Sequence, residues 1–441
     1  IPKSESDLAY FRRTLEGPCR LFEAKLRSFG FLTVDDEEQS EEEGKDSHII
    51  GPLTAFIADL PSIFADLRRR EILKSAREVV LSDYHNTMMA SGDAQDDELA
   101  SAGDIGDPKA ALEQSVSFAM QKLRFDSCQT SLAACRLLKL VHDVMKQASA
   151  GAVESTTTSG PTAPSAHIAH ALFQAARDCL ELFTAVVPMQ FADVIDTVPR
   201  MGAVFYNDCL YIAHNCTLIT HRYRLLMGKI DPSLEHTVGF ADFIPRFRSL
   251  GDRCLVRHIE EQRNVLTELV QRIRISPDSE GGGSSGNRQR DSAVLVRRHM
   301  ERLSGQWLGV LQEGVYSRLL GHLFDVILQE AMKPILLSEC IAEAAGAEVT
   351  RVYRSLQHIR MVFPTGEDKD DEGLQRVCTN WRKFLALTDL LEYSLSDVAE
   401  YLPRKKFAAF TGSEMTSLIR ALFEDSPRRQ TVLTSILEMS S

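Results

Sequence analysis

The sequence predicts an all-α protein, and three observations carry that prediction. Apolar residues recur at steps of three and four residues, which places them on one face of a helix. Alternating runs of β-branched residues, the pattern of half-buried strands, are almost absent. Polar turns separate apolar stretches of ordinary helix length, and no heptad repeat is sustained long enough to predict a coiled coil.

Composition and charge fit a soluble chain of several domains. The 441 residues suggest about three domains, and 44% of them are hydrophobic. With 50 Lys and Arg against 62 Asp and Glu, the formal net charge is −12. Because binding to phosphate backbones depends on clustered cations, this balance argues against nucleic acid as the main ligand. Nine scattered cysteines predict reduced thiols in the cytosol rather than a disulfide framework.

The apolar runs and the start of the chain give two more expectations. No stretch approaches the roughly 18–20 apolar residues of a membrane-spanning helix. The chain begins at Ile1 without a methionine and without a basic-then-apolar leader. We therefore expect no secretory signal and a fragment of a longer protein.

Polar stretches divide the chain into predicted domains. They cover residues 35–46, which are acidic, residues 90–108, residues 154–165 and residues 276–290, a Gly/Ser-rich segment with the composition of a flexible linker. We predict a partial helical domain, a central helical domain, a linker and a C-terminal helical domain, at residues 1–105, 110–278, 279–290 and 291–441.

The helical stripes follow in chain order. One consists of Leu132, Cys135, Leu138, Val141 and Met145, and the next of Val256, Ile259, Leu266, Leu269 and Ile273. Two shorter stripes lie at residues 418–423 and 432–437. Between them, Ser426 followed by Pro427 is the pattern of an N-cap and a first helical residue. This pair predicts the start of a separate last helix.

The densest candidate for chemistry is residues 209–221, which hold Cys209, His214, Cys216 and His221. On a helix at about 100° per residue, the two cysteines share one stripe and the two histidines share another, roughly 140° away. Four side chains so placed do not converge on one tetrahedral zinc ion. A metal site made of the two histidines and ligands from elsewhere in the chain stays open. The favoured interpretation is that these side chains pack in the core.

The other motifs have simpler explanations than a site. Residues 368–373 resemble the start of an EF-hand loop, but the twelfth position holds Thr379 instead of glutamate, which favours an acidic loop. Residues 281–286 lack the GK[ST] of a phosphate loop. Two basic clusters, residues 68–70 and 404–406, are of a type that contacts acidic lipid or protein, and a solvated helix face is favoured.

Trp307 and Trp381 lie in apolar helical contexts and are predicted to be core residues. There is no HExxH or paired CxxC motif. We therefore predict no catalytic, cofactor-binding or metal site, and a helical scaffold that acts through contacts with other proteins.

Several segments resemble, in order, the zeste-white-ten kinetochore and vesicle-tethering family. The family signature is similar to residues 205–224 (FYNDCLYIAHNCTLITHRYR) and 243–254 (FIPRFRSLGDRC). Residues 66–87 and 117–148 are similar to its middle region and the helical stretch that follows, and residues 380–392 and 412–437 to its C-terminal helical domain. No single motif is chemically diagnostic, and the family's N-terminal coiled-coil part is absent.

The resemblance implies an elongated rod of stacked helical bundles, as in subunits of exocyst-like tethering complexes, without catalysis or cofactor. In mitosis it implies a scaffold of the Rod–Zwilch kinetochore complex, which recruits dynein–dynactin and supports the spindle checkpoint. In interphase it implies a subunit of an endoplasmic reticulum tether that works with SNAREs in Golgi-to-ER retrograde transport. The expected localisation is cytoplasmic, peripheral at that membrane in interphase, and at kinetochores and spindle in mitosis.

Two alternatives stay open. One is a generic helical scaffold with other partners, and the other is a helical metal-dependent enzyme that uses residues 209–221. The stretches at residues 35–46, 154–165 and 276–290 depart from the family pattern, so no partner site on these loops is carried over. Because the chain is acidic, we expect no direct binding to nucleic acid and only indirect or peripheral membrane association.

Overall fold

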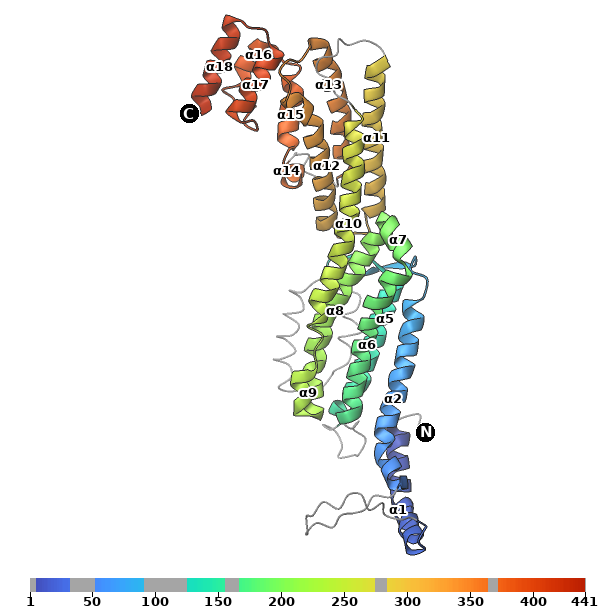
Figure 1. Cartoon of the computed structure of the whole chain (residues 1–441). Coiled ribbons are helices and arrows are strands. Elements are labelled where there is room, and N and C mark those ends of the chain that lie inside the picture. The colour runs from blue at the N-terminus through green and yellow to red at the C-terminus, as the bar shows by residue number, and fades with distance from the viewer. Residues whose placement is uncertain are drawn as a thin grey trace. The chain divides into compact units, whose positions relative to one another are not determined.

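The computed structural model describes residues 5–31, 52–90, 125–154, 166–273, 284–363 and 372–440. These residues are helical almost throughout (Figure 1). Two short strands in the described part, β1 (Thr87–Ala90) and β2 (Cys128–Ser131), pair in a two-stranded sheet. The all-α prediction is confirmed. Of the described helices, none is both long and apolar enough to cross a bilayer.

The chain packs into two compact units. The first comprises Ile1–Phe125, Thr130–Val194 and Phe205–Gly251, and the second comprises Asp126–Gln129, Ile195–Val204 and Asp252–Ser441. The division differs from the predicted ranges 110–278 and 291–441. The reason is that α7 (Ala192–Thr197), α8 (Pro199–Ile230) and α10 (Phe243–Gln271) each contribute residues to both units, so no polar stretch marks the boundary.

The first unit contains the larger part of α8 and the first part of α10. Its other helices are α1 (Glu5–Ser28), α2 (Pro52–Val80), α5 (Leu132–Glu154), α6 (Ala166–Gln190) and α9 (Pro232–Thr237). α2 and α5 pack along α6, and α1 packs on α2. The predicted stripe of α5 is largely confirmed, because Leu138, Val141 and Met145 are buried. Aromatic rings fill the centre, with the Phe183 ring 6.4 Å from Phe205 and 6.0 Å from Phe247.

The second unit contains most of the shorter helices. They are α11 (Ser284–Trp307), α12 (Glu313–Leu336), α13 (Glu343–Gln357), the 3₁₀ helix η1 (His358–Val362), α14 (Glu372–Val377), α15 (Trp381–Leu390), α16 (Leu395–Tyr401), α17 (Gly412–Leu422) and α18 (Pro427–Ser440). Trp307 and Trp381 are fully buried, which confirms both as core residues. The Trp307 indole donates to the Pro199 carbonyl at 3.1 Å, and the Trp381 ring contacts Phe324.

The predicted stripe of α10 is wrong at its first position. Val256 is exposed, and the buried face instead includes the polar residues His258 and Gln262. The Nε2 atom of His258 lies 2.6 Å from the Ile195 carbonyl. A Cβ added at Gly202 would lie 2.1 Å from that same nitrogen, so only glycine lets α8 approach the imidazole this closely. Apolar periodicity missed this face because hydrogen-bonded polar side chains occupy it.

The last two helices follow the prediction closely. α17 and α18 are separate, and α18 begins at Pro427. The Arg429 N–H donates to the Ser426 hydroxyl at 3.2 Å, which confirms Ser426 as the N-cap. Val432, Leu433 and Ile436 are buried as expected, whereas Leu437 is exposed.

The predicted linker at residues 279–290 needs a correction. Helix α11 already begins at Ser284, and only residues 279–283 lie outside the described residues. The side chain of Arg290 explains part of the difference, because its Nε donates to Glu348 of α13 at 2.9 Å. This contact joins the first part of α11, which lies within the predicted linker, to α13. The predicted loops at residues 35–46, 91–108, 155–165 and 368–371 also lie outside the described residues.

Candidate interaction surface

The four side chains of residues 209–221 that were considered as metal ligands do not lie on a common surface. Cys209 and Cys216 are buried in the first unit, and His221 is exposed. His214 is half-buried, and its ring centroid lies 5.3 Å from that of Phe125. Burial raises the pKa of the Cys216 thiol to about 12, which disfavours the thiolate that metals bind. No group of three or more His, Cys, Asp or Glu in the described ranges is arranged to hold a metal ion.

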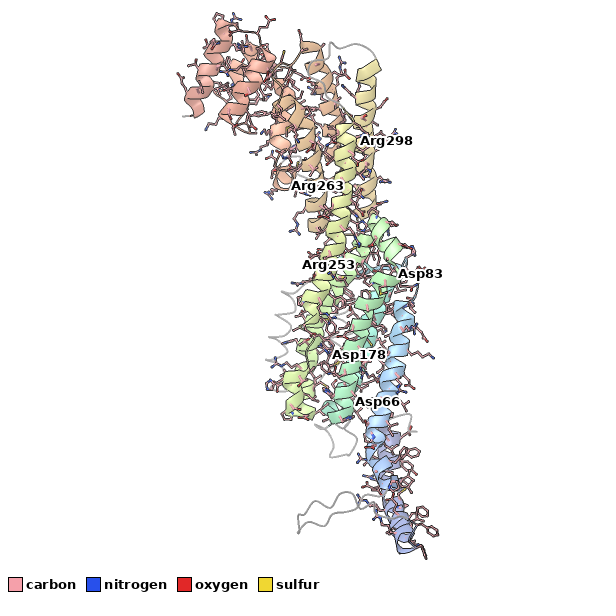
Figure 2. The ribbon with its side chains drawn as sticks, in the orientation of Figure 1. Asp66, Asp83, Asp178, Arg253, Arg263 and Arg298 are labelled. Atoms are coloured by element: carbon pink, nitrogen blue, oxygen red, sulfur yellow. The ribbon has the colours of Figure 1, made fainter. Side chains whose placement is uncertain are left out.

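The basic cluster at residues 68–70 forms ion pairs in part. Arg68 contacts Glu71 of its own helix at 2.8 Å, and Arg69 contacts Asp178 of α6 at 2.6 Å. Asp178 is labelled on α6 in Figure 2. Arg70 is exposed. Arg69 is exposed as well, so the favoured explanation, a solvated helix face, fits Arg69 and Arg70, and the ion pair of Arg69 in addition joins α2 to α6.

The second basic cluster lies in turns after α16, not on a helix face. Arg404 pairs with Glu400 at 3.0 Å, and Lys406 pairs with Asp389 at 2.9 Å. The Lys406 ammonium also lies 4.7 Å and 4.9 Å from the centroids of the Tyr393 and Tyr401 rings. The positive charges at 404 and 406 are thus engaged within the chain, which corrects the prediction of a solvated helix.

An exposed apolar surface lies on the hairpin formed by α1 and α2. The exposed fraction is 54% for Phe22 and 73% for Phe29. Phe11 and Phe22 of α1 are spaced by close to whole helical turns, so they share one face, and Phe29 follows the end of α1 at Ser28. We call this the hairpin surface, and its exposed members are Tyr10, Phe11, Leu15, Leu21, Phe22, Phe29, Phe31, Leu53 and Phe56. Exposed apolar side chains gathered in this way are typical of surfaces that bind other proteins.

A buried carboxylate holds the hairpin together. Glu23 of α1 is 2% exposed. Its Oε1 accepts hydrogen bonds from the N–H groups of Leu53, at 2.5 Å, and Thr54, at 3.1 Å. These amides belong to the first turn of α2, where N–H groups have no partner within the helix. Glu23 therefore caps α2 from a different helix.

The pKa of Glu23 reports the same contacts. Burial raises it, but the hydrogen bonds from the Thr54 hydroxyl and from the Thr54 and Leu53 amides lower it by more, so the pKa lies below its usual value. The ionised carboxylate is therefore the form that the hairpin stabilises.

Two other carboxylates join helices in the same manner. Asp208 of α8 accepts from the Ser131 amide, at 2.7 Å, just before α5. Asp325 of α12 accepts from the Asn380 amide, at 2.7 Å, and from its side-chain amide, at 2.9 Å, just before α15. The hydroxyl of Thr379, the twelfth position of the false EF-hand, also donates to Asp325. Each contact satisfies donors at a helix start from elsewhere in the chain.

Sequence reasoning missed all three carboxylates. One signal was available for Glu23, because Gly51 and Pro52 leave the start of α2 without a side-chain cap of its own. A second was available for Asp208, an acidic residue within the apolar pattern of residues 205–224. For Asp325 no local signal exists, because its partners lie 53–55 residues away.

Comparisons with known proteins agree on one family. A family model described as "Centromere/kinetochore protein zw10, C-terminal" matches residues 123–268, and one described as "ZW10 C-terminal helical domain" matches residues 292–436. The centromere/kinetochore protein zw10 homologue of Rattus norvegicus is 24% identical over 99% of this chain and 55% of its own length.

More distant organisms give similar matches. The Arabidopsis thaliana homologue is 23% identical over 100% of this chain and 53% of its own length. The centromere/kinetochore protein zw10 of Drosophila melanogaster is 21% identical over 91% of this chain and 50% of its own length. The chain therefore spans about half the length of the curated relatives it matches.

Proposed function

The chain belongs to the ZW10 family, and from that premise we propose that it is a non-catalytic scaffold subunit of a kinetochore complex. The observation that carries the proposal is the ordered match to relatives named centromere/kinetochore proteins over nearly the whole chain. An all-helical architecture supports it, since bundled helices offer long surfaces for other subunits.

The finer proposal follows the family resemblance. In mitosis the protein acts in the Rod–Zwilch complex, recruits dynein–dynactin and supports the spindle checkpoint. In interphase it acts with ER tether subunits and SNAREs in Golgi-to-ER retrograde transport, and its membrane association runs through those proteins. The net charge of −12 supports recruitment by protein rather than by anionic lipid or DNA.

Affinity capture tests this proposal. The chain, tagged at one end, is used to capture proteins from interphase and from mitotic cells. We expect Rod and Zwilch in the mitotic sample and ER tether subunits in the interphase sample. Identical partner sets in both samples would contradict the dual role, and capture of neither set would favour a scaffold of another kind.

A variant of the hairpin surface sharpens this test. We expect Phe22→Glu combined with Phe29→Glu to reduce capture of the subunits that contact this face, because both charges would have to be buried in the interface. Leu337→Glu is the matched control, since Leu337 is 74% exposed and lies on the second unit. Equal capture by both variants and the unaltered chain would assign the contacts to other surfaces.

A further inference from the structure

Asp208 lies at a junction of three segments of the first unit. Its carboxylate is fully buried on α8. The Tyr84 hydroxyl, in the turn after α2, donates to Oδ2 at 2.5 Å, and the Ser131 amide donates to Oδ1 at 2.7 Å. The Leu132 amide donates to the Asn86 carbonyl at 2.8 Å, which ties the same turn to the start of α5.

The junction is otherwise well packed. Tyr84 is fully buried, and its ring stacks on Phe191 with centroids 5.1 Å apart. The Ser131 hydroxyl accepts from the Ala134 amide at 3.1 Å, so Ser131 also caps α5. One carboxylate therefore holds both the turn and a helix start against α8.

The charge of this carboxylate is uncompensated. Asp208 forms no ion pair within the described residues, and the titratable groups that face it are Tyr84 and the Cys135 thiol of α5. Asp208 accepts hydrogen bonds from the Tyr84 hydroxyl and from the hydroxyl and amide of Ser131, but without a cation a fully buried carboxylate stays costly to ionise. Burial is the largest effect on its pKa and raises it to about 6, against the lowering effect of the bonds from Ser131 and Tyr84.

We propose that Asp208 is a proton-operated latch: the protonated carboxyl keeps the turn and the start of α5 closed on α8, and ionisation lets this junction open locally. Local opening exposes the carboxylate to water, where the charge is solvated. The ionised carboxylate therefore favours the open junction, and the protonated one favours the closed junction. The latch is independent of the scaffold role and concerns the stability of one junction.

Hydrogen exchange of the whole chain at pH 5.0 and 7.5, corrected for intrinsic exchange rates, tests the latch. The pKa of Asp208 is about 6 in the closed junction and 3.8 when the carboxyl is exposed to water. We therefore expect the equilibrium constant for opening at residues 84–90 and 130–134 to rise about tenfold from pH 5.0 to pH 7.5. Asp208→Asn keeps the shape and removes the charge, so its exchange should be equally protected at both pH values. Asp325→Asn is the matched control and should keep the tenfold response.

Two results would overturn the proposal. One is the same pH response in Asp208→Asn as in the unaltered chain, and the other is a response spread evenly over all peptides of the first unit. If Asp208→Asn fails to fold, Tyr84→Phe replaces it. This variant removes a hydrogen bond to the charged form, so the midpoint of the opening response should move to higher pH. An unchanged midpoint in Tyr84→Phe would then contradict the latch.

Discussion

The helices near the two ends of the described chain are held in opposite ways. At the C-terminal end, each of the last three helices carries its own cap. Ser394 and Asp397 form a capping box on α16, Thr411 and Glu414 form one on α17, and Ser426 caps α18. At the N-terminal end, α2 is capped by Glu23 of α1, 30 residues earlier in the chain.

The aromatic side chains of the two regions differ as well. Near the C-terminus, the Tyr393 and Tyr401 rings stack at 5.2 Å, and the ammonium of Lys406 lies over both. On the hairpin surface, Phe22 and Phe29 face solvent. The last C-terminal helices thus cap their own first turns, whereas α2 of the hairpin takes its cap from another helix and the hairpin leaves apolar side chains uncovered.

The difference in capping concerns the local stability of each helix, and the difference in exposed rings concerns which surface is free to bind another protein. A helix with its own cap needs no neighbouring helix to supply a partner for the donors of its first turn. The first turn of α2 is ordered only while α1 stays docked, because Glu23 supplies its partner. The hairpin is therefore the region where the loss of one cap should have the largest local effect, and where substitutions of exposed apolar residues should leave the fold unchanged.

Among the helix caps, the largest expected effect is that of Glu23→Ala. It leaves the amides of Leu53 and Thr54 without their charged acceptor, so local stability of the first turn of α2 should fall by about 2 kcal/mol. Hydrogen exchange of α1 and α2 measures this loss. The control is Glu16→Ala, which removes only an exposed pair with Arg20 and should change exchange by about 0.3 kcal/mol or less. Equal effects of both variants would show that Glu23 is no cap.

The second prediction concerns acid. Because the folded pKa of Glu23 lies below the usual 4.5, the folded hairpin binds fewer protons than the open one. Its contribution is complete above about pH 4.5 and is lost as the pH falls through the lowered pKa. Exchange of α2 residues 53–57 should therefore accelerate on acidification, after correction for intrinsic rates. Glu23→Gln should remove this response, and a response that persists in this variant would point to another group.

A smaller effect is expected at the C-terminal end. Ser426→Ala removes the hydroxyl that accepts from the Arg429 amide, which should cost α18 about 1 kcal/mol. Ser435→Ala, in the middle of the same helix, should be neutral or slightly stabilising, since alanine is the better helix former. Hydrogen exchange of α18 distinguishes the two. A loss at Ser435 as large as that at Ser426 would mean that packing, rather than the cap, fixes the helix start.

The same contrast shows how far the sequence alone could reach. The Ser426–Pro427 start and the α5 stripe were readable because their signals lie within one or two helical turns. Glu23, Asp208 and Asp325 were not, because Asp208 meets Tyr84 across 124 residues and only the fold brings such pairs together. The prediction that Val256 of α10 is buried was wrong, because His258 occupies the buried face instead. A hydrogen bond makes the burial of this polar side chain possible, and a pattern of apolar residues does not reveal it.

The hairpin surface could not be predicted from the sequence for a related reason. An apolar stripe on α1 has the same pattern whether another helix covers it or solvent does. Leu8 and Phe22 are both large apolar residues of α1, yet Leu8 is 5% exposed and Phe22 is 54% exposed. Only the position of α2 decides which side of α1 is buried.

The smallest expected effect is the sharpest test of the hairpin surface. Phe29→Ser should change stability by no more than about 0.5 kcal/mol, because a ring that is already solvated loses little when removed. Phe407→Ser, at a ring that is 4% exposed near the C-terminus, should cost about 3 kcal/mol. Thermal unfolding of both variants, with hydrogen exchange to locate the change, measures the difference. If Phe29→Ser were as unstable as Phe407→Ser, the Phe29 ring would have to be covered in solution. The contrast between a C-terminal region with buried rings and a hairpin with exposed rings would then be wrong.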